Sequence, residues 1–120
     1  MNLGETGKKG EALVAAFLQK HGCSLLKRNY VCRFGEIDII ARKDDYILFV
    51  EVKTRAENAI IKAAEAVDSR KQQRLILAAQ DYIVKTETEL QPRFDVAEVT
   101  VFKKADGNVG YNLNYIKNAF

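Results

Sequence analysis

The chain has 120 residues, a length that fits one domain with a single core and is too short for two. Hydrophobic residues make up 48% and charged residues 29%, as in water-soluble globular proteins, and no apolar run approaches membrane-spanning length. The net charge of +3 permits a polyanionic partner without requiring one.

The first residues and the cysteines favour a cytoplasmic protein. Met1 to Glu5 lack the charged and then apolar layout of a signal peptide. With only two cysteines, Cys23 and Cys32, we expect free thiols in a reducing compartment. His21 and Cys23 have no second pair of metal-binding residues elsewhere, so no zinc site is expected.

The first predicted element is a helix over residues 5–20, which Gly22 ends. Its apolar face, read from the helical spacing, holds Leu13, Val14, Phe17 and Leu18. Glu11 lies at the flank of this face. It either reaches a cluster of acidic residues on the sheet or is a boundary residue with a solvated carboxylate.

A strand is predicted over residues 24–31, beside the hairpin that follows it. Three basic residues lie close to the turn into that hairpin: Lys27, Arg28 and Arg33. They suit contact with a phosphate backbone, and solvated charges at a strand end are the alternative.

Two strand-like segments, residues 35–40 and 49–53, are separated by a polar turn and predict a β-hairpin. If the loop is symmetric about Asp44 and Asp45, residues whose numbers have the same sum face each other across the strands. The register of the hairpin then follows from the turn alone.

That register places Asp38 opposite Glu51 and Glu36 opposite Lys53. Because side chains alternate along a strand, Glu36 and Asp38 share one face, as do Glu51 and Lys53. Facing carboxylates in apolar strands repel each other, and a bound cation would remove the repulsion. Glu36 is a supporting candidate because it can pair with Lys53.

This arrangement suits phosphodiester hydrolysis. Mg²⁺ prefers oxygen ligands, typically one or two carboxylates with waters and phosphate oxygens, and it lowers the pKa of a bound water. Lys53 beside the ion would hold the attacking water or offset charge on the phosphate. A solvated charge ladder of Asp38, Glu51 and Lys53 explains the same spacing.

A polar loop is predicted over residues 54–58 and a short helical stripe over residues 60–67, before a longer helix over residues 68–85. The apolar face of this longer helix holds Leu75, Ile76, Ala79, Tyr82 and Ile83. Gln72 falls near the centre of the same face. Its amide either meets a backbone group of the sheet or orients a metal-bound water.

Arg70 and Arg74 project from the first turns of this helix, with Lys71 at the flank of its apolar face. The helix dipole there also attracts phosphate, which favours nucleic-acid contact. Three solvated charges on a helix are the alternative.

The last part of the chain reads as a polar connector and two strands. Pro92 ends the connector, and a buried strand is predicted over residues 93–102. We expect Asp95 to form a structural ion pair with Arg93 or with another basic residue. A turn over residues 106–108 then leads to an edge strand with alternating Tyr111, Leu113 and Tyr115.

Several segments together resemble the YraN family, over nearly the whole chain. These segments are Gly10-Glu11, Asn29 to Asp38, Phe49 to Arg55, Ala64 to Val67 with Lys71 to Leu75, and Arg93 to Val96. YraN proteins are small bacterial proteins assigned to the PD-(D/E)XK nuclease superfamily and similar to archaeal Holliday-junction resolvases.

The resemblance implies an α/β fold with a restriction-endonuclease-like core, in which helices flank a central mixed β-sheet, as one domain over residues 1–120. It implies that Asp38, Glu51 and the Val52 carbonyl hold Mg²⁺ or Mn²⁺, with Glu11 as an additional acid. Lys53 would assist the nucleophile.

We therefore expect a metal-dependent DNA endonuclease, and the resemblance to resolvases adds branched or junction DNA as substrate and a homodimer. The candidate DNA contacts are Arg33, Arg55, Arg70, Lys71 and Arg74. Two alternatives stay open: a nucleic-acid-binding module of the same fold that cleaves nothing, and an assembly protein with a vestigial charge cluster.

Overall fold

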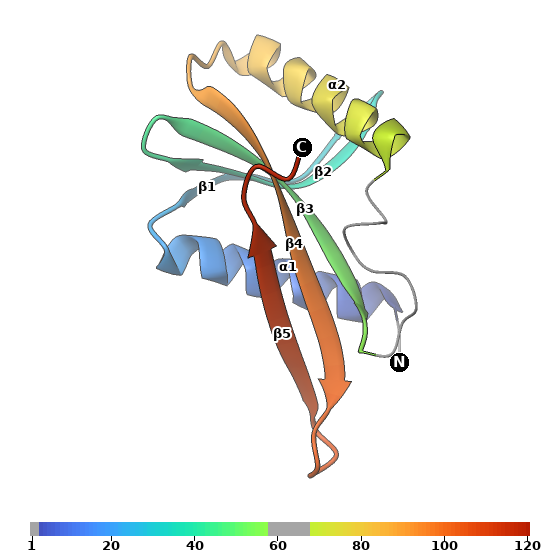
Figure 1. Cartoon of the computed structure of the whole chain (residues 1–120). Coiled ribbons are helices and arrows are strands. Elements are labelled where there is room, and N and C mark those ends of the chain that lie inside the picture. Colours follow the sequence, from blue (N-terminus) through green and yellow to red (C-terminus); the bar gives the residue numbers. More distant parts are fainter. Residues whose placement is uncertain (1–2, 58–67) are drawn as a thin grey trace.

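The computed structural model describes residues 3–57 and 68–120 (Figure 1). Its elements in chain order are α1 (Leu3–Lys20), β1 (Ser24–Cys32), β2 (Gly35–Lys43), β3 (Tyr46–Ala56), α2 (Ser69–Thr86), β4 (Gln91–Lys103) and β5 (Val109–Ile116). None of the helices in the described ranges has the length and apolar character needed to cross a membrane.

The five strands form one mixed sheet in the order β1-β2-β3-β4-β5. The β3–β4 pair is parallel and the other three pairs are antiparallel. Parallel neighbours need a crossover connection, which here includes α2. The predicted α/β class with a central mixed sheet is confirmed, and β1 lies beside the hairpin as expected.

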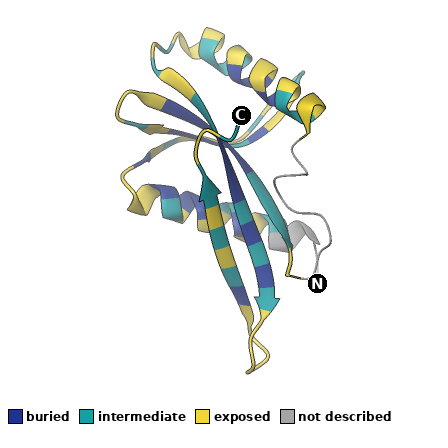
Figure 2. Cartoon of the chain, viewed as in Figure 1, coloured by how far each residue is buried: buried dark blue, intermediate teal, exposed yellow. Residues whose placement is uncertain are grey.

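The two helices cover opposite faces of the sheet (Figure 1). Val14 and Leu18 of α1 pack in one buried cluster with residues such as Val50, while Leu75 and Ala79 of α2 pack in another. Because each helix packs on the sheet with one side, it has a buried stripe and an exposed stripe (Figure 2). Both clusters use the alternation of β2, β3 and β4 across the sheet.

The central hairpin has the register that the symmetric turn predicted. Lys43 pairs with Tyr46 and Ile39 pairs with Val50, around a turn in which Asp44 has a φ of +54°. The regular pairing between β2 and β3 stops at Ile39. Asp38 is therefore the first residue of β2 beyond the regular ladder.

The helix ends follow the capping residues. Gly22 adopts a φ of +85°, and the Cys23 N–H donates a 2.9 Å hydrogen bond to the Leu18 carbonyl. At the start of α2, the Asp68 carboxylate accepts a 2.9 Å hydrogen bond from the Lys71 N–H. Both predicted helices are thus confirmed to within two residues of their predicted ends.

Some local predictions were wrong. Residues 54–56 belong to β3 rather than to a loop, because Thr54 and Ala56 pair with Val99 and Val101 of β4. Leu13 on α1 and Ile76 on α2, both predicted for apolar faces, are each 36% exposed. The predicted helical stripe over residues 60–67 lies outside the described residues.

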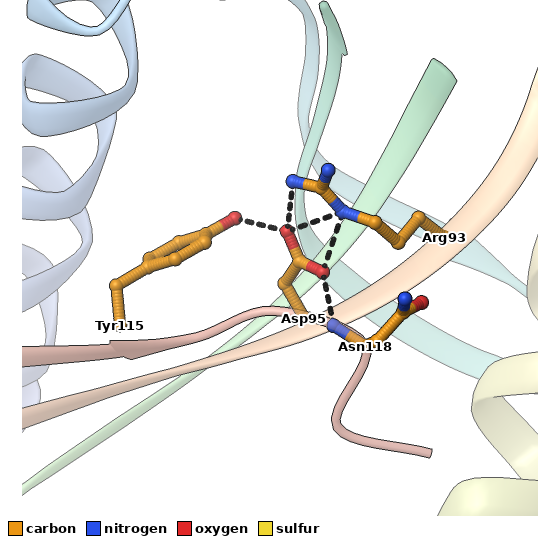
Figure 3. Close-up of polar contacts among 4 residues, drawn as sticks. All are labelled: Arg93, Asp95, Tyr115 and Asn118. Atoms are coloured by element: carbon orange, nitrogen blue, oxygen red, sulfur yellow. Dashed lines mark hydrogen bonds and ion pairs between the residues drawn. The ribbon is translucent and has the colours of Figure 1, made fainter.

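The predicted Arg93–Asp95 ion pair is confirmed. The guanidinium donates to the carboxylate through Nε at 3.0 Å and through a terminal nitrogen at 2.9 Å. Asp95 is fully buried and also accepts hydrogen bonds from the Tyr115 hydroxyl at 2.6 Å and the Asn118 N–H at 3.1 Å (Figure 3). The predicted edge strand of Tyr111, Leu113 and Tyr115 is β5.

Candidate functional site

An open cleft of about 530 Å³ lies between the β2–β3 hairpin and the first turns of α2. It is lined by Gly35, Glu36, Asp38, Glu51, Asp68, Arg70, Lys71, Arg74 and Leu75. Six of these were singled out in the sequence, three as acids of the site and three as basic contacts. The structure therefore brings two separately predicted groups of charges to one place.

Asp38 is the acid with the strongest perturbation. Burial, followed by the charge of Glu51, raises the pKa of the Asp38 carboxyl from its usual 3.8 to about 7. A 2.8 Å hydrogen bond from the Val52 N–H opposes the shift, while the charges of Glu11 and Glu36 add to it. The negative charges of the other three predicted acids therefore all raise the pKa of Asp38.

Glu51 is 6% exposed and is neutralised by two ammonium groups. Its Oε1 lies 2.7 Å from Lys71 Nζ and 3.1 Å from Lys53 Nζ. A buried carboxylate needs such compensation, because an unpaired buried charge is strongly unfavourable. Positive charge thus already gathers where the sequence predicted a cation.

The two lysines differ in how readily each gives up a proton. Burial and then the neighbouring Lys71 lower the pKa of Lys53, despite the opposing effect of Glu51. Burial also acts to lower the pKa of Lys71, but its hydrogen bonds with Glu51 and Lys53 outweigh burial and raise it. Lys53 is therefore the better candidate to exchange a proton with a reacting group.

Asn29 connects Glu11 to this site, a role that the sequence reading missed. Its Nδ2 lies 2.9 Å from Glu36 Oε1 and 3.3 Å from Glu11 Oε2. Asn29 has a φ of +52°, a left-handed conformation that asparagine tolerates better than most residues. An asparagine inside a predicted strand was the available signal.

This contact also corrects the expected pairing of Glu36 with Lys53. Glu36 hydrogen-bonds to Asn29, and the ion pair of Lys53 is with Glu51. The cause is the end of the regular β2–β3 ladder at Ile39, beyond which the extrapolated register no longer fixes cross-strand partners.

Gly10 allows α1 to approach β3 closely next to Glu11. A Cβ atom at Gly10 would collide with Thr54 Oγ1 and lie 3.3 Å from Thr54 Cβ. Only glycine fits this contact without movement. The helix-borne acid is therefore placed by a residue with no side chain of its own.

The remaining predicted residues divide into those at the cleft and those away from it. Arg70 and Arg74 are exposed at its rim, as the DNA-contact prediction requires. Arg33 stacks on the Phe34 ring, with 4.6 Å from Arg33 Cζ to the ring centroid, and does not line the cleft. Arg55 and Gln72 are half-buried and do not line it either.

Comparison with known proteins now identifies the family. The model of the "Uncharacterised protein family UPF0102" matches residues 10–99. A UPF0102 protein of Nitrosomonas europaea is 40% identical over 117 residues, which cover 98% of this chain and 94% of the relative. One from Clostridium perfringens is 45% identical over 115 residues, covering 95% and 92%. This chain belongs to the UPF0102 family.

The UPF0102 match confirms the resemblance to YraN proteins. A UPF0102 protein of Caldanaerobacter subterraneus is also 40% identical, with 100% of this chain and 98% of the relative covered. The matched range includes Glu11, Asp38, Glu51 and Lys53, as well as Arg70 and Arg74 at the rim. The family description names no reaction, so the chemistry follows from the site itself.

The donor set of this UPF0102 protein fits a hard divalent cation held by few ligands. Within residues 3–57 and 68–120, no three acidic, histidine or cysteine side chains form a ready-made metal cage. Mg²⁺ commonly uses one or two carboxylates and keeps several waters, so such a cage is not required. Asp38 and Glu51 supply two carboxylates to the cleft, which is the kind of ligand that Mg²⁺ uses.

Proposed function

We propose that this protein is a metal-dependent DNA endonuclease with a restriction-endonuclease-like core. The observation that carries the proposal is the half-buried Asp38, whose pKa is raised to about 7 by burial and then by Glu51 in the same cleft. A fold that keeps two interacting carboxylates in a half-buried site gains from a cation there, and hydrolysis of phosphodiesters uses that cation.

The proposed ion is Mg²⁺ or Mn²⁺, held by Asp38, Glu51 and the Val52 carbonyl, with Glu11 assisting. When bound, such an ion supplies Lewis acidity and lowers the pKa of water. The protein's own part is to orient the ligands. The Val52 N–H fixes one oxygen of Asp38, and Asn29 holds Glu11 beside Glu36.

Lys53 is the proposed partner of the nucleophile. Its lowered pKa and its position 3.1 Å from Glu51 suit a group that orients a water or accepts its proton. Lys71 keeps its charge more firmly and would contact the phosphate once Glu51 binds the ion. Gln72 and Glu36 are proposed supporting residues of the same site.

DNA is the proposed substrate because the rim of the cleft is basic. Arg70 and Arg74 are exposed at the start of α2, where backbone N–H groups and the helix dipole also favour phosphate. Arg33 and Arg55 would serve as outlying contacts. Branched or junction DNA, and a homodimer, are proposed by analogy with resolvases.

The proposal is tested by cleavage of single-stranded, duplex and four-way-junction DNA with Mg²⁺, with Mn²⁺ and with chelator. We expect cutting only with metal, and a loss of at least about 100-fold in Asp38→Asn and Lys53→Met, since each removes a group of the reacting site. Asp44→Asn and Lys103→Gln, exposed and outside the cleft, are matched controls that retain activity. Metal-independent cutting, or full activity in both site variants, would overturn the proposal.

A second candidate is a nucleic-acid-binding module that does not cleave. The observation favouring it is the 2.7 Å Lys71–Glu51 contact, which occupies a proposed metal ligand with an ammonium group. This candidate predicts DNA binding with Kd unchanged by metal and no cutting under any condition. Absence of any DNA binding at low salt would instead favour an assembly protein.

A further inference from the structure

A second cavity of about 270 Å³ lies at the carboxyl end of α1, and it shares no lining residue with the cleft. The cavity is bounded by α1, the turn after it, and the strand ends that carry Lys43, Leu48, Arg93 and Tyr115. Its volume is slightly below the range of typical small-ligand pockets, which begins at about 300 Å³. None of the nuclease residues proposed above takes part in it.

One wall of this cavity is aromatic. The Phe17 ring lies 4.1 Å from the His21 ring and 5.3 Å from the Tyr115 ring, measured between centroids. His21 Nδ1 is 2.8 Å from the Phe17 carbonyl, so Nδ1 carries the proton and donates. This bond holds the His21 ring against Phe17 at an interplanar angle of 33°, so this wall presents tilted aromatic rings.

The other side of the cavity is cationic. Lys43, Arg93 and Lys117 all line it. Burial raises the pKa of the Cys23 thiol in the cavity, whereas the charges of these three residues each act to lower it and the charge of Asp95 acts to raise it. In the described ranges neither lysine forms an ion pair, so both charges remain available.

Only one edge of the Arg93 guanidinium is paired with a carboxylate. Its Nε and one terminal nitrogen bond Asp95, and Figure 3 shows the other terminal nitrogen pointing away from that carboxylate. Asp95 is itself bonded by Tyr115 and Asn118, and its oxygens are occupied by these donors. Asp95 therefore balances the guanidinium but not the two lysines.

The helix dipole does not cancel this excess either. The carboxyl end of α1 has a partial charge of about −0.5, which favours nearby cations. Its last carbonyls are also capped, since Phe17 and Leu18 accept hydrogen bonds from the turn that follows. Because this partial charge is smaller than the charge of the two lysines, the side chains that line the cavity keep an excess of positive charge.

We propose that this cavity binds a phosphate ester of a planar ring, such as a nucleoside monophosphate. The lysines and the outer edge of Arg93 recognise the phosphate, and the Phe17–His21 wall takes the ring. The phosphate ester comes either from a free nucleotide or from the 5′ end of a DNA strand. Neither source requires the proposed cleavage activity.

The test uses thymidine 5′-monophosphate as probe, with titration calorimetry in the presence of chelator. We expect binding to the full chain, and a Kd raised at least about tenfold in Lys43→Gln/Lys117→Gln. Lys103→Gln/Lys104→Gln, at the exposed end of β4 and the start of the turn after it, removes the same charge and should leave Kd unchanged. Thymidine, which lacks the phosphate, should not bind.

Amide chemical shifts locate the site during the same titration. Shifts at His21, Cys23 and Tyr115, without shifts at Glu36 and Asp38, support the cavity. The proposal is overturned by shifts confined to the cleft, by equal binding to both double variants, or by no binding of any phosphate probe. The variants carry only exposed or half-buried lysine changes, so unchanged thermal unfolding verifies their fold.

A short oligonucleotide, with and without a 5′-phosphate, distinguishes the two sources. If the phosphorylated strand alone binds in a lysine-dependent way, the strand end is the ligand. If the free nucleotide binds and the strand does not, the ligand is a free nucleotide. Because chelator is present throughout, a missing nuclease activity changes none of these results.

Discussion

Asp38 is a residue of the candidate site whose ionised side chain lowers the stability of the folded protein. Its carboxyl is half-buried near three other acids, and its pKa of about 7 means that ionising it in the folded protein is costly. The Val52 N–H recovers only part of this cost. The cation proposed for this site would compensate a carboxylate placed so unfavourably.

Replacing Asp38 with asparagine should therefore stabilise the metal-free protein at neutral pH. Below pH 3.8 the carboxyl is protonated in both states, whereas between 3.8 and about 7 only the unfolded state loses the proton, so wild-type stability falls as pH rises. Asp38→Asn keeps an oxygen for Val52 and should gain roughly 2–4 kcal/mol at pH 8, since one pKa unit is about 1.4 kcal/mol.

Urea unfolding from pH 4 to 8, with chelator, measures this gain. Asp44→Asn, an exposed change at a position with positive φ, should leave the pH dependence as it is in the wild type. Added Mn²⁺ should stabilise the wild type increasingly above pH 7 and have little effect on Asp38→Asn. If Asp38→Asn is less stable than the wild type at pH 8, the electrostatic account is contradicted.

The sequence predicts some residues of the site and misses others for physical reasons. Turn symmetry is a local rule and predicted the register from Lys43–Tyr46 to Ile39–Val50, which ends one residue short of Asp38 and Glu51. Those two acids nevertheless line the same cleft. The ion pair between Lys71 and Glu51 depends on how α2 packs on the sheet. The position of the Asn29 side chain depends on the left-handed φ of that residue. Neither follows from spacing along the chain.

At the scale of elements, the site depends on how closely α1 approaches β3. Gly10 is buried against Thr54, and the next residue is the helix-borne acid Glu11. Gly7, one turn earlier on the same helix, has open space where its Cβ would be. Substitutions at the two glycines therefore measure two different effects on stability. A Cβ atom at Gly7 changes only the helix propensity, whereas one at Gly10 also changes the packing against Thr54.

Gly10→Ala and Gly7→Ala should have opposite effects on stability. Where a helix position has room for a Cβ atom, alanine gains up to about 1 kcal/mol over glycine, and Gly7→Ala should show this gain. At Gly10 the same gain is outweighed by overpacking against Thr54, at about 1–3 kcal/mol. Denaturant unfolding of the two variants measures the difference.

Relief by a second change tests the cause. Gly10→Ala combined with Thr54→Ala removes the colliding hydroxyl and should recover much of the loss, though the Thr54 Cβ position stays close. If both alanine variants are equally stable, α1 does not pack on β3 as closely as the structure has it.

Element boundaries show what local patterns can and cannot predict. The ends of α1 and α2 carry their own signals in Gly22 and Asp68, and both helices were predicted. The carboxyl end of β3 was not, because Thr54 and Arg55 are polar and residues 54–56 gain strand structure from β4, more than forty residues away. Leu13 and Leu18 illustrate the same limit, since helical spacing placed both on the apolar face and only Leu18 is buried.

At the scale of the whole molecule, the sheet separates two cores, and Asp95 fastens the end of the chain to it. The Asp95 carboxylate joins Arg93 of its own strand, Tyr115 of β5 and the Asn118 N–H beyond β5 (Figure 3). The Asn118 contact could not be predicted from a motif, because it joins residues 23 positions apart. This network also forms one side of the cavity at the end of α1.

The last prediction concerns this buried pair. Asp95→Ala leaves the mostly buried guanidinium of Arg93 without its partner and should cost about 3–5 kcal/mol. Arg93→Ala leaves the buried carboxylate with only Tyr115 and Asn118, and should also be strongly destabilising. The double variant should cost less than the sum of the single ones by about 1–3 kcal/mol, since neither charge is then left unpaired. Urea unfolding at pH 7 measures the stability of all three variants.

The control is Lys85→Met, which breaks the exposed ion pair with Asp81 and should cost no more than about 0.5 kcal/mol. Strictly additive losses at Arg93 and Asp95 would mean that the two charges do not stabilise each other.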